Sequence, residues 1–218
     1  MMPRTLEARD EKILDFIIRS YVRRAEPVAS SDVRSGLRLK ESPATIRSIV
    51  ASLDEEGFLA QPYTSAGRIP TDQAYRYFVD YLMADDIRRR IARAASDIRS
   101  IADALGMLAI AAQDGDTDSY GLSYLLSQPE FREQHAVRRV AHLIDHAEDI
   151  FDAYRGIPER RIFIGRENPV REAADCSVFY VERDDGGRRQ EMLFVGPTRV
   201  NYEKISAFIH EFFNHHDR

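Results

Sequence analysis

Apolar residues in the first quarter of the chain recur at steps of three and four, which is the spacing of one buried helix face. This spacing predicts three helices, over residues 6–24, 30–37 and 43–56. The residues expected on their inward faces are Ile13, Leu14, Ile17, Ile18 and Tyr21 in the first helix, Val33 and Leu37 in the second, and Ile46, Ile49, Val50 and Leu53 in the third. On the opposite side of the third helix, small and polar residues are expected to face solvent.

The ends of these predicted helices carry residues that suit helix termini. Ser30 and Ser31 can accept hydrogen bonds from the first backbone N–H groups of the second helix. Ser42-Pro43 is a strong start for the third helix, because the hydroxyl caps it and proline needs no donor at the first helical position. Gly57 can adopt the left-handed conformation that ends this helix.

A hairpin is predicted directly after the third helix. Phe58-Leu59 begin a short strand, and a segment rich in Pro, Thr, Ser and Gly turns the chain around Ala66-Gly67. Pro70-Thr71-Asp72 ends the returning strand and caps a fourth helix. Three helices and a hairpin with a Gly-Arg tip together describe a winged helix-turn-helix domain over residues 1–83.

Between Asp85 and Gln113 the apolar residues alternate strictly at steps of four and three. A period of 3.5 residues held for about three heptads is typical of a helix that packs along another helix. We therefore predict a long connecting helix over residues 84–114 that pairs two copies of the chain. The residues expected on its dimerisation face are Ile87, Ile91, Ile98, Ile101 and Leu105.

The rest of the chain mixes helix and strand patterns. Residues 113–118 (QDGDTD) predict a loop and a domain boundary, and residues 136–154 predict an amphipathic helix. Strands are expected at residues 161–164, 177–182 and 191–195, with a final helix from Asn201 onward. The whole chain is therefore predicted to be α+β, with residues 115–218 as its C-terminal domain.

Charge and hydropathy narrow the choice of environment and partner. The net charge of −5 arises in residues 115–218, whereas residues 1–83 carry 12 basic and 12 acidic side chains. Binding to nucleic acid would therefore depend on where the basic groups lie rather than on bulk charge. No apolar run approaches the roughly 18 residues of a membrane span, and the first residues lack a signal core. We expect a cytoplasmic protein that does not enter a membrane.

Few residues point to catalysis or metal binding. Cys176 is the only cysteine, which excludes an internal disulfide and favours a small core residue. His142 and His146 lie four residues apart, a spacing that can chelate zinc, yet they lie beside the apolar stripe of an ordinary amphipathic helix with no HExxH order. Phosphate-loop, GxSxG and dinucleotide motifs are absent from the sequence. The prediction is therefore neither an enzyme nor a protein with a metal or cofactor.

A winged helix-turn-helix lays its third helix in the major groove of DNA and its wing beside the backbone or minor groove. Arg47 can bind a guanine edge with two hydrogen bonds, and short neighbouring side chains let the helix approach closely. The candidates are Thr45, Arg47 and Ser48 for bases, Ser30, Ser31 and Ser42 for phosphates, and Arg68 for a phosphate or the minor groove. A winged helix that binds protein instead of DNA is the alternative.

Several segments resemble the heat-inducible transcription repressors, the HrcA family. SPATIR (42–47), DEEGFL (54–59) and especially TSAGRIPTDQAYRYFVD (64–80) are similar to the N-terminal domain of that family. Three later segments are similar to its C-terminal region and keep the same order: GLSYLLSQPEF (121–131), IGRENP (164–169) and VGPTRVNY (195–202).

The resemblance implies a dimeric repressor with a winged helix, a connecting helix and a GAF-like domain. Such a repressor binds an inverted-repeat operator in double-stranded DNA upstream of chaperone genes, and its activity depends on the GroEL chaperonin. The DNA contacts that the resemblance implies are Ser42, Thr45 and Arg47 on the third helix and Thr64, Ser65, Gly67 and Arg68 on the hairpin.

The chain also departs from the family pattern. Ser48-Ile49 follow Arg47 where the family has Asn and an acidic residue, so the operator sequence is expected to differ, and Tyr63 stands where His is common. The resemblance also implies that the chain is shorter than typical members by more than roughly a hundred residues, about the size of one domain. Because Gln113 is followed almost directly by GLSYLL, the first strands of the GAF-like domain and the domain inserted within it are expected to be missing, leaving a reduced domain with three strands.

A regulator of the same architecture that answers a small ligand is the second alternative. A pocket in the C-terminal domain would need convergent polar groups, for which Arg166, Glu167, Asn168 and Arg199 are the candidates. The same four residues also suit turns and helix starts.

Overall fold

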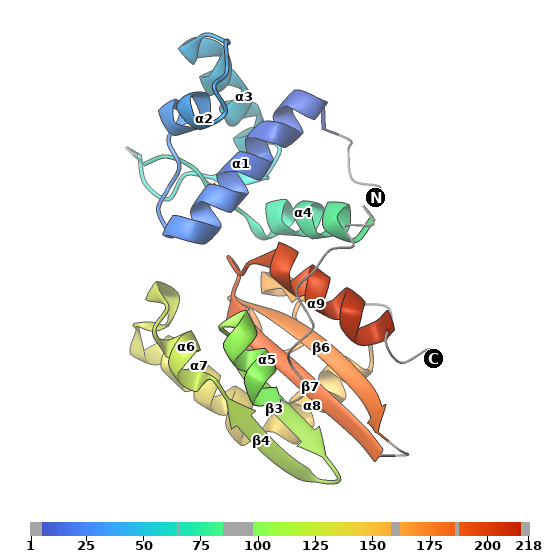
Figure 1. The fold of residues 1–218 in the computed structure, drawn as a ribbon. Helices are drawn as coiled ribbons and strands as arrows, with labels where there is room; N and C mark the ends of the chain where they lie inside the picture. Colours follow the sequence, from blue (N-terminus) through green and yellow to red (C-terminus); the bar gives the residue numbers. More distant parts are fainter. Residues whose placement is uncertain (1–5, 65, 85–97, 158–161, 186–187, 215–218) are drawn as a thin grey trace. The chain divides into compact units, whose positions relative to one another are not determined.

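The computed structural model of the chain describes residues 6–64, 66–84, 98–157, 162–185 and 188–214. The chain divides into two compact units, Met1–Ile87 and Arg88–Arg218 (Figure 1). Each unit has its own hydrophobic core.

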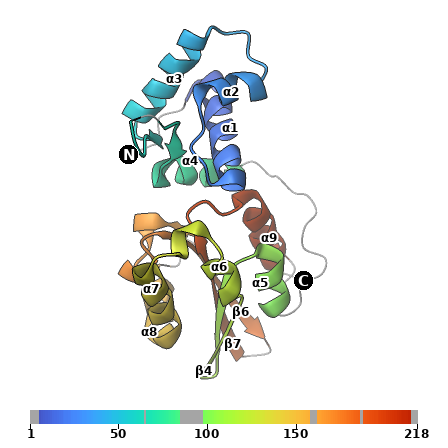
Figure 2. The same cartoon turned by 90° about the vertical axis from the view of Figure 1, so that its left-hand side faces the viewer.

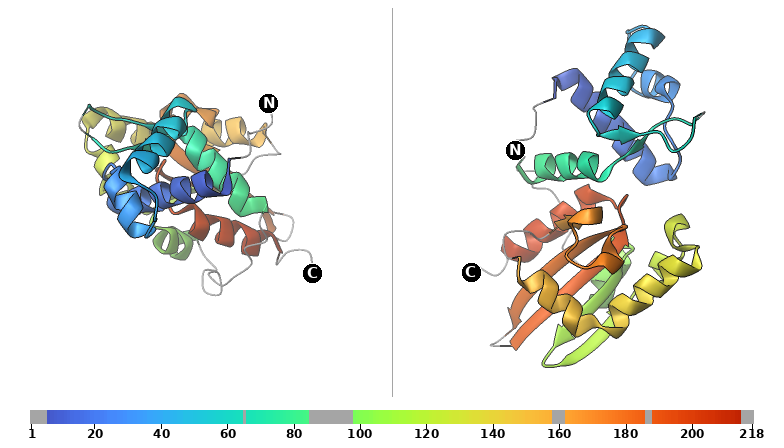
Figure 3. Two further views of the ribbon diagram at one scale, coloured as in Figure 1. Left: turned by 90° about the horizontal axis from the view of Figure 1, so that it is seen from above. Right: turned by 180° about the vertical axis from the view of Figure 1, so that it is seen from behind.

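The N-terminal unit follows the predicted order of three helices, a hairpin and a fourth helix. Its elements are α1 (Ala8–Arg24), α2 (Ser30–Gly36), α3 (Pro43–Glu55), β1 (Leu59–Ala60), β2 (Ile69–Pro70) and α4 (Asp72–Ala84). Strands β1 and β2 are antiparallel, with Leu59 opposite Pro70. The loop between them projects to one side of the helices (Figure 3, right). Gly57 has the expected left-handed conformation, with φ of 84°.

Helix spacing predicted the core of this unit well because each helix buries one stripe of its own residues. The side chains of Ile13, Ile17, Val33, Ile46 and Leu53 are almost completely buried. Phe58 and Leu59 from the hairpin, and Tyr75, Phe78 and Val79 from α4, complete the core.

The C-terminal unit is built on a five-stranded antiparallel sheet in the order β4-β3-β7-β6-β5. The strands are β3 (Leu108–Gln113), β4 (Asp116–Tyr120), β5 (Ile162–Ile164), β6 (Cys176–Asp185) and β7 (Arg188–Pro197). The predicted segments at residues 161–164, 177–182 and 191–195 coincide with parts of β5, β6 and β7. An α+β fold with this sheet is consistent with a GAF-like domain.

Helices cover both faces of the sheet (Figure 2). One face bears α6 (Leu122–Leu126), α7 (Gln134–Asp145) and α8 (Ala147–Arg155), and the other bears α5 (Ile98–Leu105) and α9 (Tyr202–Asn214). Short 3-10 turns lie at Pro129–Phe131, Gly165–Glu167 and Arg171–Ala173. Leu108 and Ile110 of β3 pack into the core beneath α7 and α8, and Phe194 meets Phe208 of α9 on the other face, with ring centroids 5.8 Å apart.

Of the predicted continuous helix over residues 84–114, residues 85–97 lie outside the described ranges, Ile98–Leu105 is helical, and the prediction is wrong beyond Leu105. Gly106, with φ of 66°, ends α5, and Leu108–Gln113 form β3 in the middle of the sheet. Strand β3 is buried on both faces, and its sequence LAIAA is apolar at every position. Such a run fits both the heptad spacing of a helix and a buried strand, so the sequence did not distinguish them. The domain boundary predicted after this segment is therefore also wrong.

The loop predicted over residues 113–118 is a β-hairpin. Gln113 pairs with Asp116, which leaves Asp114-Gly115 as a two-residue turn with φ of 53° and 88°. Both central residues of a type I′ turn need positive φ, and Asp-Gly is a preferred pair for it. The expectation of a reduced, three-stranded sheet is wrong, because β3 and β4 supply two further strands.

Two helix predictions in this unit also need correction. The helix expected over residues 136–154 is interrupted at His146, where φ is −117° and ψ is 35°, so that α7 and α8 are separate. Ile101, expected to pair with a second copy, is buried inside its own unit, where α5 packs on β3. Ile98 and Leu105 are half-buried, and Ile87 and Ile91 lie outside the described residues.

Among the helices of the described ranges, none has both the length and the apolar character that a membrane-crossing segment requires.

Candidate nucleic-acid interface

The start of α3 presents short polar side chains and an arginine to solvent. Ser42 caps the helix, because its Oγ accepts a hydrogen bond from the Thr45 backbone N–H at 3.1 Å. Thr45, Arg47 and Ser48 are exposed, whereas Ile46 faces the core. The outward side chains of the first two turns of α3 are therefore polar and, apart from Arg47, small.

Arg47 occupies the centre of a continuous surface. It lines a hollow of about 420 Å³ together with Ser31 and Arg34 of α2. It also lines a second hollow of about 330 Å³, which Gly67 and Ala66 border from the hairpin. Within the described residues, no hydrogen bond or ion pair engages the Arg47 guanidinium. Its five N–H donors are therefore available to an acceptor from outside.

The first turn of α2 forms the far edge of this surface. The helix begins at Ser30 with Ala29 in the N-cap position, so neither predicted serine caps it. Asp32, at the third helical position, accepts a hydrogen bond from the Ala29 N–H at 3.4 Å, which is the reciprocal contact of a capping box. Ser31 is exposed and Ser30 half-buried. Both hydroxyls remain on the same side of the unit as Arg47.

The hairpin is joined to the segment before α2 by its backbone. Val28 and Arg68 exchange two backbone hydrogen bonds of 2.9 Å each. Gly67 makes this close approach possible, because a Cβ at this position would lie 2.3 Å from the Val28 carbonyl oxygen. The glycine therefore has a packing role in the hairpin, in addition to any contact with a ligand.

Arg68 lies at the base of the hairpin and not at its tip, so the predicted tip position is wrong. Its Nε is 2.6 Å from Oδ2 of Asp54 on α3, and its side chain is 21% exposed. Thr64 lies exposed nearer the tip. Ser65 falls outside the described residues.

Three of the four candidates for a ligand pocket in the C-terminal unit, Glu167, Asn168 and Arg199, make structural contacts. Asn168 donates through Nδ2 to the carbonyls of Gly165, Ala173 and Cys176 and accepts a 2.8 Å hydrogen bond from the Tyr154 hydroxyl. Glu167 accepts from the Ile164 N–H, at 3.1 Å.

Arg199 donates from Nε to Glu130 at 2.5 Å and from Nη2 to Gln128 at 2.8 Å. Glu167, Asn168 and Arg199 therefore stabilise turns, which is the structural role that the sequence also allowed for them.

The two histidines and the cysteine form no metal centre in the described residues. The His142 and His146 rings lie 4.2 Å apart, but no group of three or more ligand side chains there could hold an ion. Cys176 is buried, and the desolvation raises the pKa of its thiol to about 12. A protonated, enclosed thiol is a poor nucleophile.

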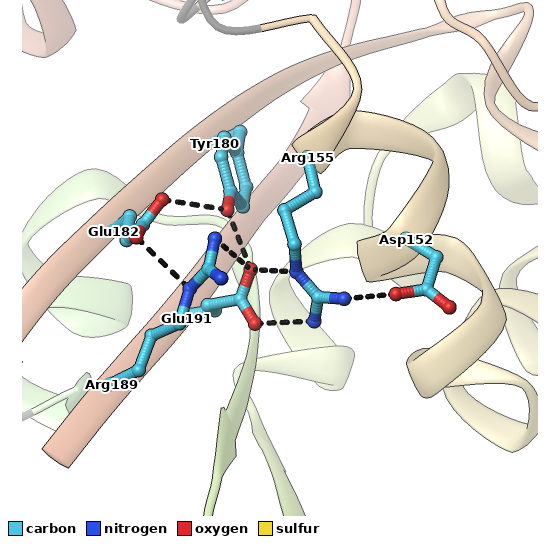
Figure 4. Close-up of polar contacts among 6 residues, drawn as sticks. All are labelled: Asp152, Arg155, Tyr180, Glu182, Arg189 and Glu191. Carbon is cyan, nitrogen blue, oxygen red and sulfur yellow. Dashed lines mark hydrogen bonds and ion pairs between the residues drawn. The ribbon is translucent and has the colours of Figure 1, made fainter.

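Sequence reasoning missed a buried ionic cluster between α8 and the sheet (Figure 4). Glu191 of β7 is only 4% exposed, and Arg155 donates to it from Nε at 2.9 Å and from Nη2 at 2.6 Å. The Tyr180 hydroxyl donates to the same carboxylate at 2.5 Å, and Arg189 lies 3.8 Å away. Asp152 forms an ion pair with the outer side of Arg155.

The cluster explains how a carboxylate can be buried in this sheet. Burial acts to raise the pKa of Glu191, but the hydrogen bonds from Arg155 and Tyr180 and the nearby positive charges outweigh it and lower that pKa. Arg155 and Glu191 are 36 residues apart, so no local sequence pattern connects them. The only available signal was an isolated acidic residue, Glu191, beside the apolar run MLFV.

Comparisons with known proteins support the resemblance. The family model for the HrcA protein C-terminal domain matches residues 79–205, more than half of the chain. A heat-inducible transcription repressor HrcA of Geobacter sulfurreducens is 44% identical over 105 residues, which cover 44% of this chain and 31% of that protein. The Chlorobium chlorochromatii repressor of the same name is 52% identical over 80 residues, which cover 37% of this chain and 23% of that protein.

A solved structure described as "Crystal structure of a hypothetical protein at 2.2 A resolution" matches with a TM-score of 0.79. It is 16% identical and covers 97% of each chain, which supports the fold alone. The matched part of the chain covers less than a third of the length of each of the two repressors named above. The family model covers most of the chain's C-terminal unit. On the strength of that match, the chain belongs to the HrcA family.

Proposed function

We propose that this chain is a heat-inducible transcription repressor that binds double-stranded DNA through α3 and the adjoining hairpin. The observation that carries the proposal is the position of Arg47, exposed and without an internal partner among the described residues, on a helix whose outer side is otherwise small and polar. The order of three helices and a hairpin in this unit supports its description as a winged helix. Membership of a repressor family supports the same assignment.

In the proposed complex, the first turns of α3 enter the major groove. Arg47 donates two hydrogen bonds to O6 and N7 of a guanine, the commonest specific contact of this kind. Thr45 and Ser48 are short enough for a close approach and can each bond a base edge. Ser48 replaces the amide common in the family, so the preferred operator is expected to differ at the adjacent base.

Phosphate contacts fix the orientation of the helix in the groove. Ser30 and Ser31 lie in the first turn of α2, and Ser42 lies at the start of α3, where backbone N–H groups and the helix dipole attract an anion. Thr64 and Ser65 of the hairpin are proposed to contact a neighbouring phosphate. Such local contacts let residues 1–83, whose 12 basic and 12 acidic side chains cancel, bind DNA.

Repression is proposed to need two copies of the chain. Two winged helices at a fixed separation would read the half-sites of an inverted repeat, spaced by whole turns of about 10 base pairs. Ile98 and Leu105 remain candidates for the pairing face because they are only half-buried. Control by the chaperonin and release on heating are further parts of this proposal, as is a cytoplasmic location.

Selection of DNA from a random duplex pool by the purified protein tests the proposal. We expect enrichment of an inverted repeat, with G·C pairs at the positions that Arg47 reads. A pool that stays unenriched after repeated rounds at low salt would contradict DNA binding and favour the alternative of a protein-binding winged helix.

A further inference from the structure

The exposed end of the hairpin carries an aromatic side chain instead of a cation. Tyr63 is 62% exposed, more than any other large apolar side chain in the described part of the chain. Between Gly57 and Tyr75 the sequence contains a single cation, Arg68. A winged helix usually places its wing against the DNA backbone or minor groove. Tyr63 and Arg68 are therefore the two strongest candidates for the main side-chain contact of the hairpin.

Arg68 is already committed to an internal role. Its Nε lies 2.6 Å from the Asp54 carboxylate, and its backbone is bonded in both directions to Val28. A phosphate that binds the remaining N–H groups of the Arg68 guanidinium would lie close to the Asp54 carboxylate, which is 31% exposed. The negative charge of that carboxylate would offset part of the attraction between Arg68 and a phosphate.

Hydrogen bonds restrain the backbone of the described hairpin residues on both sides of Tyr63. Gln61 donates from Nε2 to the carbonyl oxygens of Thr64 and Ala66, at 2.9 and 3.0 Å. The Ala66 N–H also donates to the Tyr63 carbonyl, at 2.9 Å, which closes a turn. A side chain on such a turn loses little backbone entropy when it binds.

On the basis of the proposed function, we infer that Tyr63 is the hairpin's main side-chain contact with DNA. The Asp54–Arg68 ion pair then positions the hairpin against α3. The Tyr63 hydroxyl can donate to a phosphate oxygen while the ring covers the sugar. Because Asp54 lies on the helix that carries Arg47, the ion pair makes the hairpin and the reading helix approach DNA as one body.

A single tryptophan provides a direct test, because the chain contains none. Tyr63→Trp places the probe at the hairpin, and Tyr81→Trp is the matched control on α4, where Tyr81 is 52% exposed. The ligands are the selected duplex and a mixed-sequence duplex of equal length. We expect saturating amounts of either duplex to change the emission of Tyr63→Trp and to leave that of Tyr81→Trp unchanged. Unchanged emission at both positions, with binding verified by anisotropy of labelled DNA, would overturn the inference.

The salt dependence of binding separates the parts of Tyr63 and Arg68. Loss of one phosphate contact from a cation lowers the slope of log K against log salt by about 0.9. We expect Arg68→Met to keep the wild-type salt slope. At a fixed salt concentration, Tyr63→Ala should lower the affinity about tenfold, and the control Tyr81→Ala should leave it unchanged. A slope reduced by about 0.9 in Arg68→Met would identify Arg68 as the phosphate ligand and overturn the inference.

Asp54→Asn tests the positioning role. Without the ion pair, we expect weaker binding at an unchanged salt slope. We also expect a smaller emission change when Asp54→Asn is combined with Tyr63→Trp, and Asp54→Glu should restore part of both. Tighter binding with a steeper slope would mean that Asp54 merely restrained Arg68 from DNA, which contradicts the proposed role. Absence of binding by the wild-type chain would reject the proposed function itself, whereas loss through Arg47→Ala with silent Tyr63 variants would reject only this inference.

Discussion

Replacement of Arg155 by methionine tests the account of the buried cluster in the C-terminal unit. The change removes both donors that Arg155 offers to Glu191 and keeps most of the aliphatic length. Glu191, 4% exposed, would be left in the sheet with a carboxylate that its surroundings solvate poorly. Removing one partner of a buried ion pair typically costs about 3–5 kcal/mol.

Two features of the cluster reduce this figure. The Arg155 side chain is 35% exposed, so water can replace part of its contribution, and Arg189 remains 3.8 Å from Glu191. We therefore expect a loss of about 2–3 kcal/mol in the free energy of unfolding of this unit. For a unit of this size the loss corresponds to a fall of about 5–10 °C in Tm.

The stability cost of Arg155→Met should depend on pH. The fold lowers the pKa of Glu191, so the resulting stability is present above the ordinary carboxyl pKa and is lost as the pH falls through the lowered value. Arg155→Met should therefore be most harmful at neutral pH, and the difference from wild type should shrink in acid. Urea unfolding followed by circular dichroism at pH 7 and at the lowest pH that keeps the wild type folded measures both differences.

Two further variants complete the experiment. Arg139→Met removes a comparable but more exposed ion pair with Asp175 and should cost less than about 1 kcal/mol. Arg155→Met combined with Glu191→Met should recover part of the loss, because no buried charge remains. A cost of Arg155→Met equal to that of Arg139→Met, or the same cost at both pH values, would refute the reasoning.

Three other outcomes are expected. Gly67→Ala should destabilise the N-terminal unit by about 1–3 kcal/mol in thermal melting, because the new Cβ would lie 2.3 Å from the Val28 carbonyl oxygen; an unchanged Tm would contradict the close approach. Ile98→Asp with Leu105→Asp should separate a dimer in sedimentation while leaving the monomer folded, whereas Ile101→Asp should unfold the C-terminal unit; a dimer that survives the double change would refute pairing through α5. Cys176, whose pKa is raised to about 12, should react with a thiol reagent at neutral pH only after unfolding, and rapid reaction of the native protein would contradict its burial.

The N-terminal unit could be predicted almost element by element because its signals are local. The stripes through Ile13 and Ile46, the Ser42 cap and the turn at Gly57 each depend on residues within a few positions of one another. The exception is the ion pair of Arg68, whose partner Asp54 is 14 residues away and carries no pattern that identifies it.

The C-terminal sheet was harder to predict for two physical reasons. Strand β4 is an exposed edge strand with the polar sequence DTDSY, so it lacks the alternation that marks a half-buried strand. Strand β3 is buried on both faces, and its continuous apolar run extended the spacing of α5. Its pairing with β7 connects residues about eighty positions apart, which no local pattern encodes.

The most direct test of the central claim is the effect of Arg47→Ala on binding to the selected duplex and to a mixed-sequence duplex of the same length. If α3 reads bases, the change should cost about 1–3 kcal/mol on the selected duplex and much less on the mixed one, with exposed Arg24→Ala as the control. An equal loss on both duplexes, or none on either, would contradict base recognition by this helix.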